Sequence, residues 1–291
     1  MRVAVVGEPA GWHVGRLTAA LAAAGHEPTV VPWAAIGAAV TAGADGFSPP
    51  AIAGCDVVAV RGMPGAGGPA DRLEEIVLRM DVLGRLAARG TRVVNMPRAL
   101  EVAIDKYLSL SLLAAAGLPV PETRVVQGTA AAVAAAAALG ERCVLKPLFG
   151  SRGRGLQLLA TAEEVAAAVA ARGPVAYLQE FVAHEGWDVR ILVVGDAWFA
   201  MRRVAPAGEW RTNVSLGGRP EPFAPPADWI RLAFRAAAAV SAEVAGVDIL
   251  PARDGRVLVL EVNAVPGWRG LEAATCADVA GAVARHLTTG M

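Results

Sequence analysis

The chain has few cysteines and no net charge, and each deficit makes a class of protein less plausible. Only three cysteines occur in 291 residues, and Cys55, Cys143 and Cys276 have neither disulfide-framework nor metal-motif spacing. We therefore expect buried thiols in a reducing cytoplasm. Lysine plus arginine and aspartate plus glutamate both number 27, so the overall charge gives no reason to expect nucleic acid as a partner.

Long hydrophobic runs and the common nucleotide-binding fingerprints are missing as well. No stretch resembles the ~20 apolar residues of a membrane span. The first residues, MRVAVVG, are typical of a core strand rather than a signal peptide. Gly7, Gly11 and Gly15 do not form GxGxxG, and the chain lacks the GxxxxGK[ST] pattern. We expect a cytoplasmic protein with no membrane partner.

The N-terminal third, residues 1–96, has the pattern of a small parallel α/β domain. Continuous apolar strands alternate there with helical segments, as is typical of parallel sheets. The segment 34–54 is rich in Gly, Ala and Pro, and we expect it to be a loop. The expected strands lie near 2–6, 28–31, 56–60 and 92–95, and the expected helices near 14–24 and 70–89.

The remaining two thirds predict two further lobes, residues 97–182 and 183–291. Pro97 opens a helical segment that continues to Gly117, and Thr161 with Glu164 forms a capping box ahead of an Ala-rich helix. The expected strands are 143–147, 156–160, 177–182, 188–195 and 197–205, and the later helices are 226–245 and 274–287. The fold class is therefore α/β, with α+β lobes following the parallel domain.

The segment GVDILPARDGRVLVLEVN, residues 246–263, brings carboxylates together through its own geometry. Asp254-Gly255 predicts a two-residue hairpin loop, which places Asp248 opposite Glu261. Alternation puts Glu261 and Asn263 on one face, with Leu258, Leu260 and Val262 on the other. Facing carboxylates repel unless a cation lies between them, and these oxygen ligands suit Mg²⁺. An ordinary hairpin with a solvated polar end, or a register shift by a bulge at Pro251, is the alternative.

A second group of residues suits an anionic ligand. The loop GSRGRG, residues 150–155, alternates glycines, whose backbone N–H groups can approach phosphate oxygens, with arginines. Lys146 precedes it inside an apolar strand, where a lysine needs an anionic partner. A solvated hairpin tip and a surface lysine are the alternatives.

The segment between the two lobes can contribute to the same site. Main-chain groups of Gln179-Glu180-Phe181-Val182 can bond an adenine edge, with Phe181 and Val182 as apolar walls. The segment WRTNVSLGG and the strand arginines Arg190 and Arg203 can hold a phosphoryl group or an anionic intermediate. A connecting strand without a ligand, and ordinary surface charges, are the alternatives.

Taken in order, KPLFGSRGRGL, QEFV, DVRILVVG, MRRVA, RTNVSLGG, GVDIL and LEVNAVPG resemble the ATP-grasp ligases, and more narrowly the RimK-type α-L-glutamate ligases. The resemblance runs from about Asn95 to the C-terminus and implies an N-terminal pre-ATP-grasp domain and two lobes that clasp ATP. Val265 departs from the usual EVNASPG. The segment VPGWRGL, with GWH at 11–13, resembles bacterial relatives associated with tetrahydromethanopterin-type cofactors.

The resemblance implies roles for individual residues. Asp248, Glu261 and Asn263 match Mg²⁺ ligands, with Mn²⁺ as an alternative metal, and Arg211 belongs to a segment that matches one reaching the reaction centre. We expect Arg203 or Arg211 to hold the acyl phosphate and the tetrahedral oxyanion. Asp188 lies near the ribose in this comparison. The positions that match ATP contacts are Lys106, Lys146, Gly150, Ser151, Arg152, Gly153, Arg154, Gly155, Glu180, Phe181, Val182, Asp188, Arg211, Thr212 and Asn213.

These features predict an ATP- and Mg²⁺-dependent ligase that joins a substrate carboxylate to an amine through an acyl phosphate. The expected partners are L-glutamate and a small-molecule carboxylate acceptor, with a pterin-type cofactor as a candidate acceptor. The alternatives are a RimK-type modifier of a protein C-terminus, another amino-acid or dipeptide ligase, and a non-catalytic nucleotide-binding regulator. The sequence leaves homo-oligomer formation open.

Overall fold

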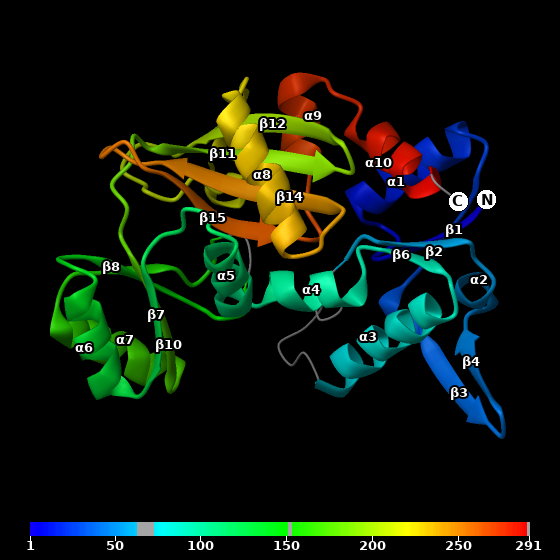
Figure 1. Cartoon of the computed structure of the whole chain (residues 1–291), viewed down its shortest axis with the longest axis horizontal. Coiled ribbons are helices and arrows are strands. Elements are labelled where there is room, and N and C mark those ends of the chain that lie inside the picture. The colour runs from blue at the N-terminus through cyan, green and yellow to red at the C-terminus, as the bar shows by residue number, and fades with distance from the viewer. Residues whose placement is uncertain (63–72, 151–152, 290–291) are drawn as a thin grey trace.

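Among the described residues, three sheets of four or five strands follow one another along the chain, each with helices packed on it, and a two-stranded ribbon accompanies the first (Figure 1). The computed structural model describes residues 1–62, 73–150 and 153–289. Helices and strands are both abundant, so the predicted mixed α/β class is confirmed. No helix within these ranges is long and apolar enough to cross a membrane.

The first sheet is parallel, with strand order β2-β1-β5-β6. Its strands consist largely of valine, and β1 and β5 are buried almost throughout, as in a sheet covered on both faces. The elements of this part are β1 (Arg2–Val6), α1 (Trp12–Ala23), β2 (Glu27–Val31), β3 (Gly37–Thr41), β4 (Ala44–Ser48), α2 (Pro50–Ala53), β5 (Val57–Val60), α3 (Leu73–Ala88) and β6 (Arg92–Val94).

The segment predicted as a loop, residues 34–54, is structured, and that prediction was wrong. It contains the β3–β4 hairpin and the short helix α2. Gly43 takes a positive φ of 82° in the tight turn, and Asp45 on β4 accepts from Arg85 of α3 at 2.9 Å. The small residues that suggested a loop thus form a ribbon that helix α3 holds.

The second sheet is antiparallel, with order β7-β10-β8-β9 and helices α6 and α7 packed beside it (Figure 1). Thr161 and Glu164 form the predicted capping box at the start of α7. The elements are α4 (Pro97–Ile104), α5 (Lys106–Ala115), β7 (Thr123–Gln127), α6 (Thr129–Ala138), β8 (Cys143–Lys146), β9 (Gln157–Leu159), α7 (Ala162–Arg172) and β10 (Val175–Glu180).

The helical segment after Pro97 is two helices rather than one, because Asp105 interrupts it. The Asp105 carboxylate accepts the N–H groups of Tyr107 and Leu108 at 2.9 and 3.0 Å and so caps α5. Lys106 therefore occupies the first helical position of α5, and α5 packs against β15 and α8 of the third sheet.

The third sheet is antiparallel, with order β13-β12-β11-β14-β15, and α8 packs on it (Figure 1). Gly195-Asp196 forms the predicted tight connection, with Gly195 at φ 55°. The elements are β11 (Trp187–Val194), β12 (Ala197–Val204), β13 (Arg219–Pro222), α8 (Ala227–Ala239), β14 (Val244–Pro251), β15 (Val257–Asn263), α9 (Arg269–Thr275) and α10 (Val279–Thr288).

Two further predictions need correction in this region. The helix expected over 226–245 ends at Ala239, because Ser241 turns the backbone to φ 56° and the chain enters β14. Cys276 is exposed at the left-handed C-terminus of α9, whereas Cys55 and Cys143 are buried as expected. Helix α10 packs against α1 of the first part, so the last helix lies beside the first (Figure 1). The boundaries 1–96, 97–182 and 183–291 stay a prediction.

Candidate active site

One pocket is lined by residues from both the second and the third sheet, together with Lys106 of α5. Most of the predicted site residues meet there. Ser151 and Arg152 lie outside the described residues, and Gly155 and Asn263 do not line the pocket. Those that do are Lys106, Lys146, Gly150, Gly153, Arg154, Glu180, Phe181, Val182, Asp188, Arg203, Arg211, Thr212, Asn213, Asp248 and Glu261.

The hairpin β14–β15 pairs Asp248 with Glu261, as predicted, but its loop length and strand register differ from the prediction. The loop has three residues, 253–255, because Ala252 pairs with Arg256, and this shifts the register by one. A bulge between Asp248 and Ile249 then shifts it back. Two offsets cancel, and the carboxylate pair survives.

The bulge changes which side chains share a face with Glu261. Leu258 and Leu260 were predicted to lie opposite it, and that prediction was wrong. Both join an apolar cluster with Val182 and Leu250, and Leu260 lines the pocket beside Glu261. Val262 lies in the core on the other side, as predicted. The pocket face of the hairpin is therefore apolar near the loop and acidic near Asp248.

Acids and arginines alternate along the pocket side of the third sheet. Arg203 Nε donates to Asp188 Oδ1 at 2.7 Å, and its Nη2 lies 2.9 Å from Asp248 Oδ2. Arg190 holds the same Asp248 in a bidentate pair, with both bonds at 2.7 Å. Arg190 also lies 3.7 Å from Glu261. Arg203 is thus fixed between two carboxylates rather than free in the cavity.

The pKa values of the two facing carboxyl groups are shifted in opposite directions. Burial disfavours the charge of Asp248, but Arg190 and Arg203 outweigh it and hold the pKa of Asp248 well below its usual range. Glu261 is 42% exposed, towards the pocket. Its pKa is raised, first by the loss of bulk solvent around it and then by the charge of Asp248. A cation bound near this pair would reduce the repulsion between the two carboxylates.

Three cations in the pocket have no carboxylate within ion-pair distance in the described part of the chain: Lys106, Lys146 and Arg154. Lys106 Nζ donates to Gly150 O at 2.6 Å, and Lys146 Nζ donates to Gln179 Oε1 at 2.5 Å. Burial lowers the pKa of Lys146 to about 8 and also lowers that of Lys106. Charges without acidic partners in a desolvated pocket are suited to an anionic ligand.

Two loops meet over the pocket. Gly153, at φ 69°, lies so close to Asn213 and Leu216 that any side chain there would collide with both. Arg211 in the second loop donates to Glu209 through Nε and Nη2. The glycine loop and the 211–213 segment therefore touch across the two sheets.

Other predicted residues serve contacts that the sequence did not reveal. Glu180 pairs with Arg256 of the hairpin at 2.8 Å, and Arg256 lowers the pKa of that carboxyl group. Phe181 lies edge-on to Trp210, with ring centroids 5.9 Å apart. Pocket residues that were not assigned a role individually are Val144, Pro147, Leu156, His184, Trp210, Leu250 and Leu260. His184 lies outside every quoted motif, whereas Trp210 begins WRTNVSLGG and Leu250 ends GVDIL.

The predicted metal ligands form a set of two carboxylates and one amide. Asn263 pairs with Gly246 next to the Asp248–Glu261 pair, and its Oδ1 accepts the N–H of Val265 at 2.9 Å. Over the described ranges, no group of three or more His, Cys, Asp or Glu side chains could hold a metal ion. The oxygen donors and the raised pKa of Glu261 fit a hard cation, which would share Asp248 with its arginines.

Comparison with known proteins agrees with this geometry. A family model described as a RimK-like ATP-grasp domain matches residues 103–287. The chain is 34% identical over 233 residues to the tetrahydromethanopterin:alpha-L-glutamate ligase of Methanosarcina acetivorans, covering 69% of this chain and 72% of that protein. It is 38% identical over 209 residues to a probable alpha-L-glutamate ligase of Sodalis glossinidius, covering 68% and 69% of the two chains.

Solved structures give the same result over the whole length. The ATP-grasp ligase PsnB, complexed with a minimal precursor, has a TM-score of 0.78 and 29% identity, with 99% of this chain and 98% of that chain covered. A RimK domain protein from Sphaerobacter thermophilus has a TM-score of 0.76 and 28% identity, with 99% and 100% covered.

The fold and these matches define an ATP-grasp enzyme, an ATP-dependent ligase that forms C–N bonds. The chain belongs to the RimK-like ATP-grasp family. PsnB was also solved in complex with a variant of its minimal precursor, Mg and ADP, so this ATP-grasp relative binds both Mg and a nucleotide. The predicted family and ATP-grasp fold are therefore confirmed.

Proposed function

We propose that this ligase joins a substrate carboxylate to the amine of L-glutamate, using ATP and Mg²⁺ and passing through an acyl phosphate. One observation carries the proposal: a single pocket combines cations that lack acidic partners with the facing carboxylates Asp248 and Glu261. The first group suits a triphosphate, and the second suits the cation that accompanies it.

The nucleotide would span the pocket from its apolar part to its cationic part. Val182, Leu250 and Leu260 form the apolar wall against which a base can pack. Lys106, Lys146 and the glycine loop would hold the triphosphate, with charge-assisted bonds from the lysines. A bound anion would stabilise the charge of Lys146, which burial disfavours.

Asp248, Glu261 and Asn263 are the residues that would hold Mg²⁺, or Mn²⁺ in its place. When bound, the metal would neutralise phosphate charge during transfer. The chain's own contribution is to keep Asp248 ionised through Arg190 and Arg203, so that an acidic ligand is always present.

The proposed reaction proceeds in two steps. A carboxylate oxygen of the acceptor attacks the γ-phosphorus, forming an O–P bond while the bond to the β-phosphate oxygen breaks and ADP leaves. The neutral amine then attacks the acyl carbon, forming the C–N bond, expelling phosphate and losing a proton. Arg203 and Arg211 line the pocket and would stabilise the developing oxyanion, where one donor is worth roughly 3–4 kcal/mol.

The names of the relatives support glutamate as the amine substrate. The curated relatives are described as alpha-L-glutamate ligases, and one is a tetrahydromethanopterin:alpha-L-glutamate ligase. We therefore place L-glutamate first and a reduced pterin cofactor that carries a carboxylate among the leading acceptors.

A peptide carboxylate is the second candidate acceptor. Its support is the likeness to PsnB, which was solved in complex with a minimal precursor and with a precursor peptide. The lobes of the present chain are arranged closely enough like those of PsnB to give a TM-score of 0.78.

Phosphate release from ATP and Mg²⁺ tests the proposal, measured with L-glutamate and a panel of acceptors. The panel contains reduced pterin cofactors, peptides with C-terminal or side-chain carboxylates, and single amino acids. An acceptor-dependent signal with a glutamyl mass increment in the product would support it. Tight ATP binding without turnover on any acceptor would favour the nucleotide-binding regulator, and a different mass increment would favour another amino-acid ligase.

A further inference from the structure

Side chains from residues 1–96, the first part of the chain, contact a short segment of the third sheet's region that directly follows Asn263. This segment, residues 264–268, is called the 264–268 loop. A polar side chain of the first part contacts it at every second residue. The contacts are Asn95 Nδ2 to Ala264 O at 2.6 Å, Arg61 Nη2 to Pro266 O at 2.7 Å, and Trp268 N to His13 Nε2 at 2.9 Å.

The three side chains come from one edge of the parallel sheet. Asn95 follows β6, Arg61 follows β5, and His13 lies in the first turn of α1, which follows β1. These are the carboxyl ends of parallel strands, where open α/β sheets usually place ligand-binding groups. In this chain the same edge contacts a loop of the third sheet.

Arg61 carries a charge that lacks an acidic partner among the described residues. Its guanidinium lies over the Trp268 ring, 4.1 Å from the centroid, and its Nε is enclosed without a hydrogen-bond acceptor. The loss of solvent lowers the pKa of Arg61 to about 9. An enclosed cation of this kind is costly, and the ring face and the Pro266 carbonyl are what offset the cost.

His13 contacts the same tryptophan. Its ring is edge-on to Trp268, with centroids 5.1 Å apart, and its Nε2 also accepts the N–H of Arg269 at 3.3 Å. Both N–H groups belong to the beginning of α9 and lack a side-chain cap of their own. Trp268 is completely buried, so its position fixes the end of the loop.

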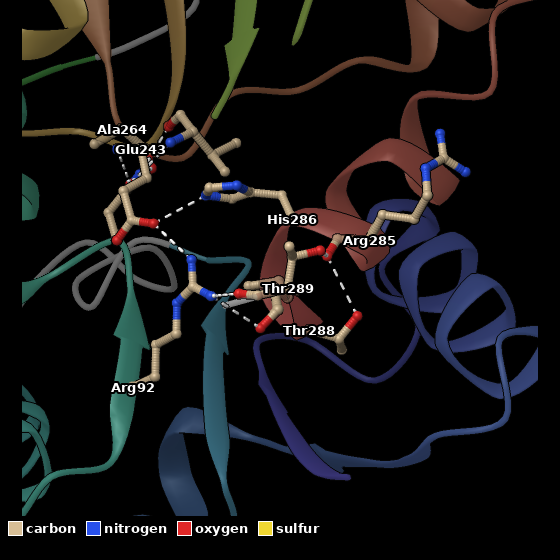
Figure 2. A network of polar contacts seen from close by, with 10 residues as sticks. Arg92, Glu243, Ala264, Arg285, His286, Thr288 and Thr289 are labelled. Carbon is tan, nitrogen blue, oxygen red and sulfur yellow. Dashed lines mark hydrogen bonds and ion pairs between the residues drawn. The ribbon is translucent and has the colours of Figure 1, made fainter. Parts of the chain in front are cut away.

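Asn95 holds the start of the loop and the start of β14 together. Its amide also donates to Val244 O at 2.7 Å, and its Oδ1 accepts the N–H of Glu243 at 2.8 Å. Asn95 is 2% exposed, so these bonds form within the core. Figure 2 shows Ala264 beside Glu243 in this network. The start of the 264–268 loop therefore cannot move without β14.

We propose that Arg61, His13 and Asn95 are positioning residues that fix Asn263 through the 264–268 loop and so set the metal affinity of the site. This inference rests on the proposed function, in which Asn263 is a Mg²⁺ ligand. It joins GWH and VPGWRG, the two segments that set the sequence apart, into one contact. Groups that orient a metal ligand typically change metal affinity by 10–100-fold when they are removed.

Mn²⁺ binding in the presence of AMPPNP tests the proposal, measured by the loss of the free Mn²⁺ electron paramagnetic resonance signal. Arg61→Met and His13→Phe should weaken Mn²⁺ binding by roughly tenfold or more. Binding of AMPPNP without metal should stay within about twofold of wild type, because the loop does not line the nucleotide pocket. Arg61→Lys and His13→Gln keep a cation or an acceptor and should recover part of the Mn²⁺ affinity.

Arg92→Met is the matched control. Arg92 also joins the first part of the chain to the third sheet, through Glu243 at 2.8 Å, but does not contact the 264–268 loop. It should lower thermal stability and leave Mn²⁺ affinity unchanged. If Arg61→Met does not fold, His13→Phe decides, because it places another aromatic ring against Trp268 and keeps Arg61 over that ring.

Two outcomes separate this inference from the proposed function. Wild-type affinity for Mn²⁺ in folded Arg61→Met and His13→Phe would overturn the positioning role while leaving the metal site in place. Failure of the wild-type enzyme itself to bind Mn²⁺ with AMPPNP would overturn the metal site and the positioning role together.

Discussion

Lys146 Nζ lies 2.5 Å from Gln179 Oε1, and this amide oxygen takes the place of a carboxylate. Gln179 in turn donates to Thr123 Oγ1 at 2.9 Å, which fixes the amide orientation. A neutral acceptor leaves the lysine charge uncompensated, and burial lowers the pKa of Lys146 to about 8. The site is thus prepared for an anion rather than neutralised in advance.

Nucleotide affinity should therefore fall as the pH rises through about 8. Only the protonated lysine attracts phosphate, and a bound anion raises its pKa, so the dissociation constant should increase by up to about tenfold per pH unit above that value. Calorimetric titration with AMPPNP between pH 7 and 9.5 measures the slope. Lys146→Arg, charged throughout this range, should abolish the slope, whereas a slope retained in this variant would assign it to another group.

Asp248→Asn and Glu261→Gln should both abolish Mg²⁺-dependent turnover but should differ in stability. Asp248 pairs with Arg190 and Arg203 inside the sheet, so its loss removes the bidentate partner of Arg190 and one of the two carboxylates that hold Arg203. Removing one member of such a group costs about 3–5 kcal/mol. Glu261 opens towards the pocket, and its replacement should cost less than about 1 kcal/mol.

Urea denaturation of these two variants measures the difference. Equal unfolding free energies would contradict the idea that the arginines depend on Asp248. Full Mg²⁺-dependent turnover in either variant would remove that residue from the metal site.

Gly153→Ala should weaken nucleotide binding by about tenfold, an effect of about 1.4 kcal/mol. A Cβ at this position would push the glycine loop away from Asn213 and open the contact over the pocket. Gly128→Ala is the matched control, since Gly128 also has a positive φ of 86° and nothing within 4 Å of its Cβ position. Both variants carry backbone strain, so equal nucleotide affinities would show that the loop contact is unimportant.

Glu243 should stabilise the protein above about pH 4.5 and progressively less as the pH falls towards 2. Its carboxylate accepts from His286 at 2.9 Å and Arg92 at 2.8 Å (Figure 2), and these partners lower its pKa to about 2 from an ordinary 4.5. A depressed carboxyl pKa gives stability that protonation removes.

Thermal unfolding of wild type and Glu243→Gln over pH 2–7 measures this contribution. The difference in melting temperature should be constant at neutral pH and shrink between about pH 4.5 and 2. A difference that does not change with pH would mean that the carboxylate contributes packing rather than charge.

Local patterns were enough to predict the elements whose signals lie close together in the sequence. The capping box of Thr161 and Glu164 and the tight connection at Gly195 formed as expected. The ribbon at 37–48 was missed because small residues give little strand signal, and its support comes from Asp45 and α3, far away in sequence.

The sequence motifs predicted which residues line the pocket, but they did not predict which charged side chains pair with one another there. The motifs named nearly all of its lining residues, including Arg203. They could not show that Arg203 is locked between Asp188 and Asp248, because that contact depends on the register of three strands. The predicted roles of Asp188 and Asn263 stay predictions.

The bulge in β15 has a further consequence for the evolution of the site. Neighbouring residues of a regular strand point to opposite faces, so same-face side chains lie about 6.6 Å apart along it. Here Leu260 and Glu261, adjacent in sequence, both face the pocket. Deletion of Leu260 would remove the bulge and leave Asp248 facing Glu261, while the apolar wall would lose one of its side chains. The apolar and the acidic halves of the pocket face thus meet at Leu260 and Glu261, so either half can diverge without the other.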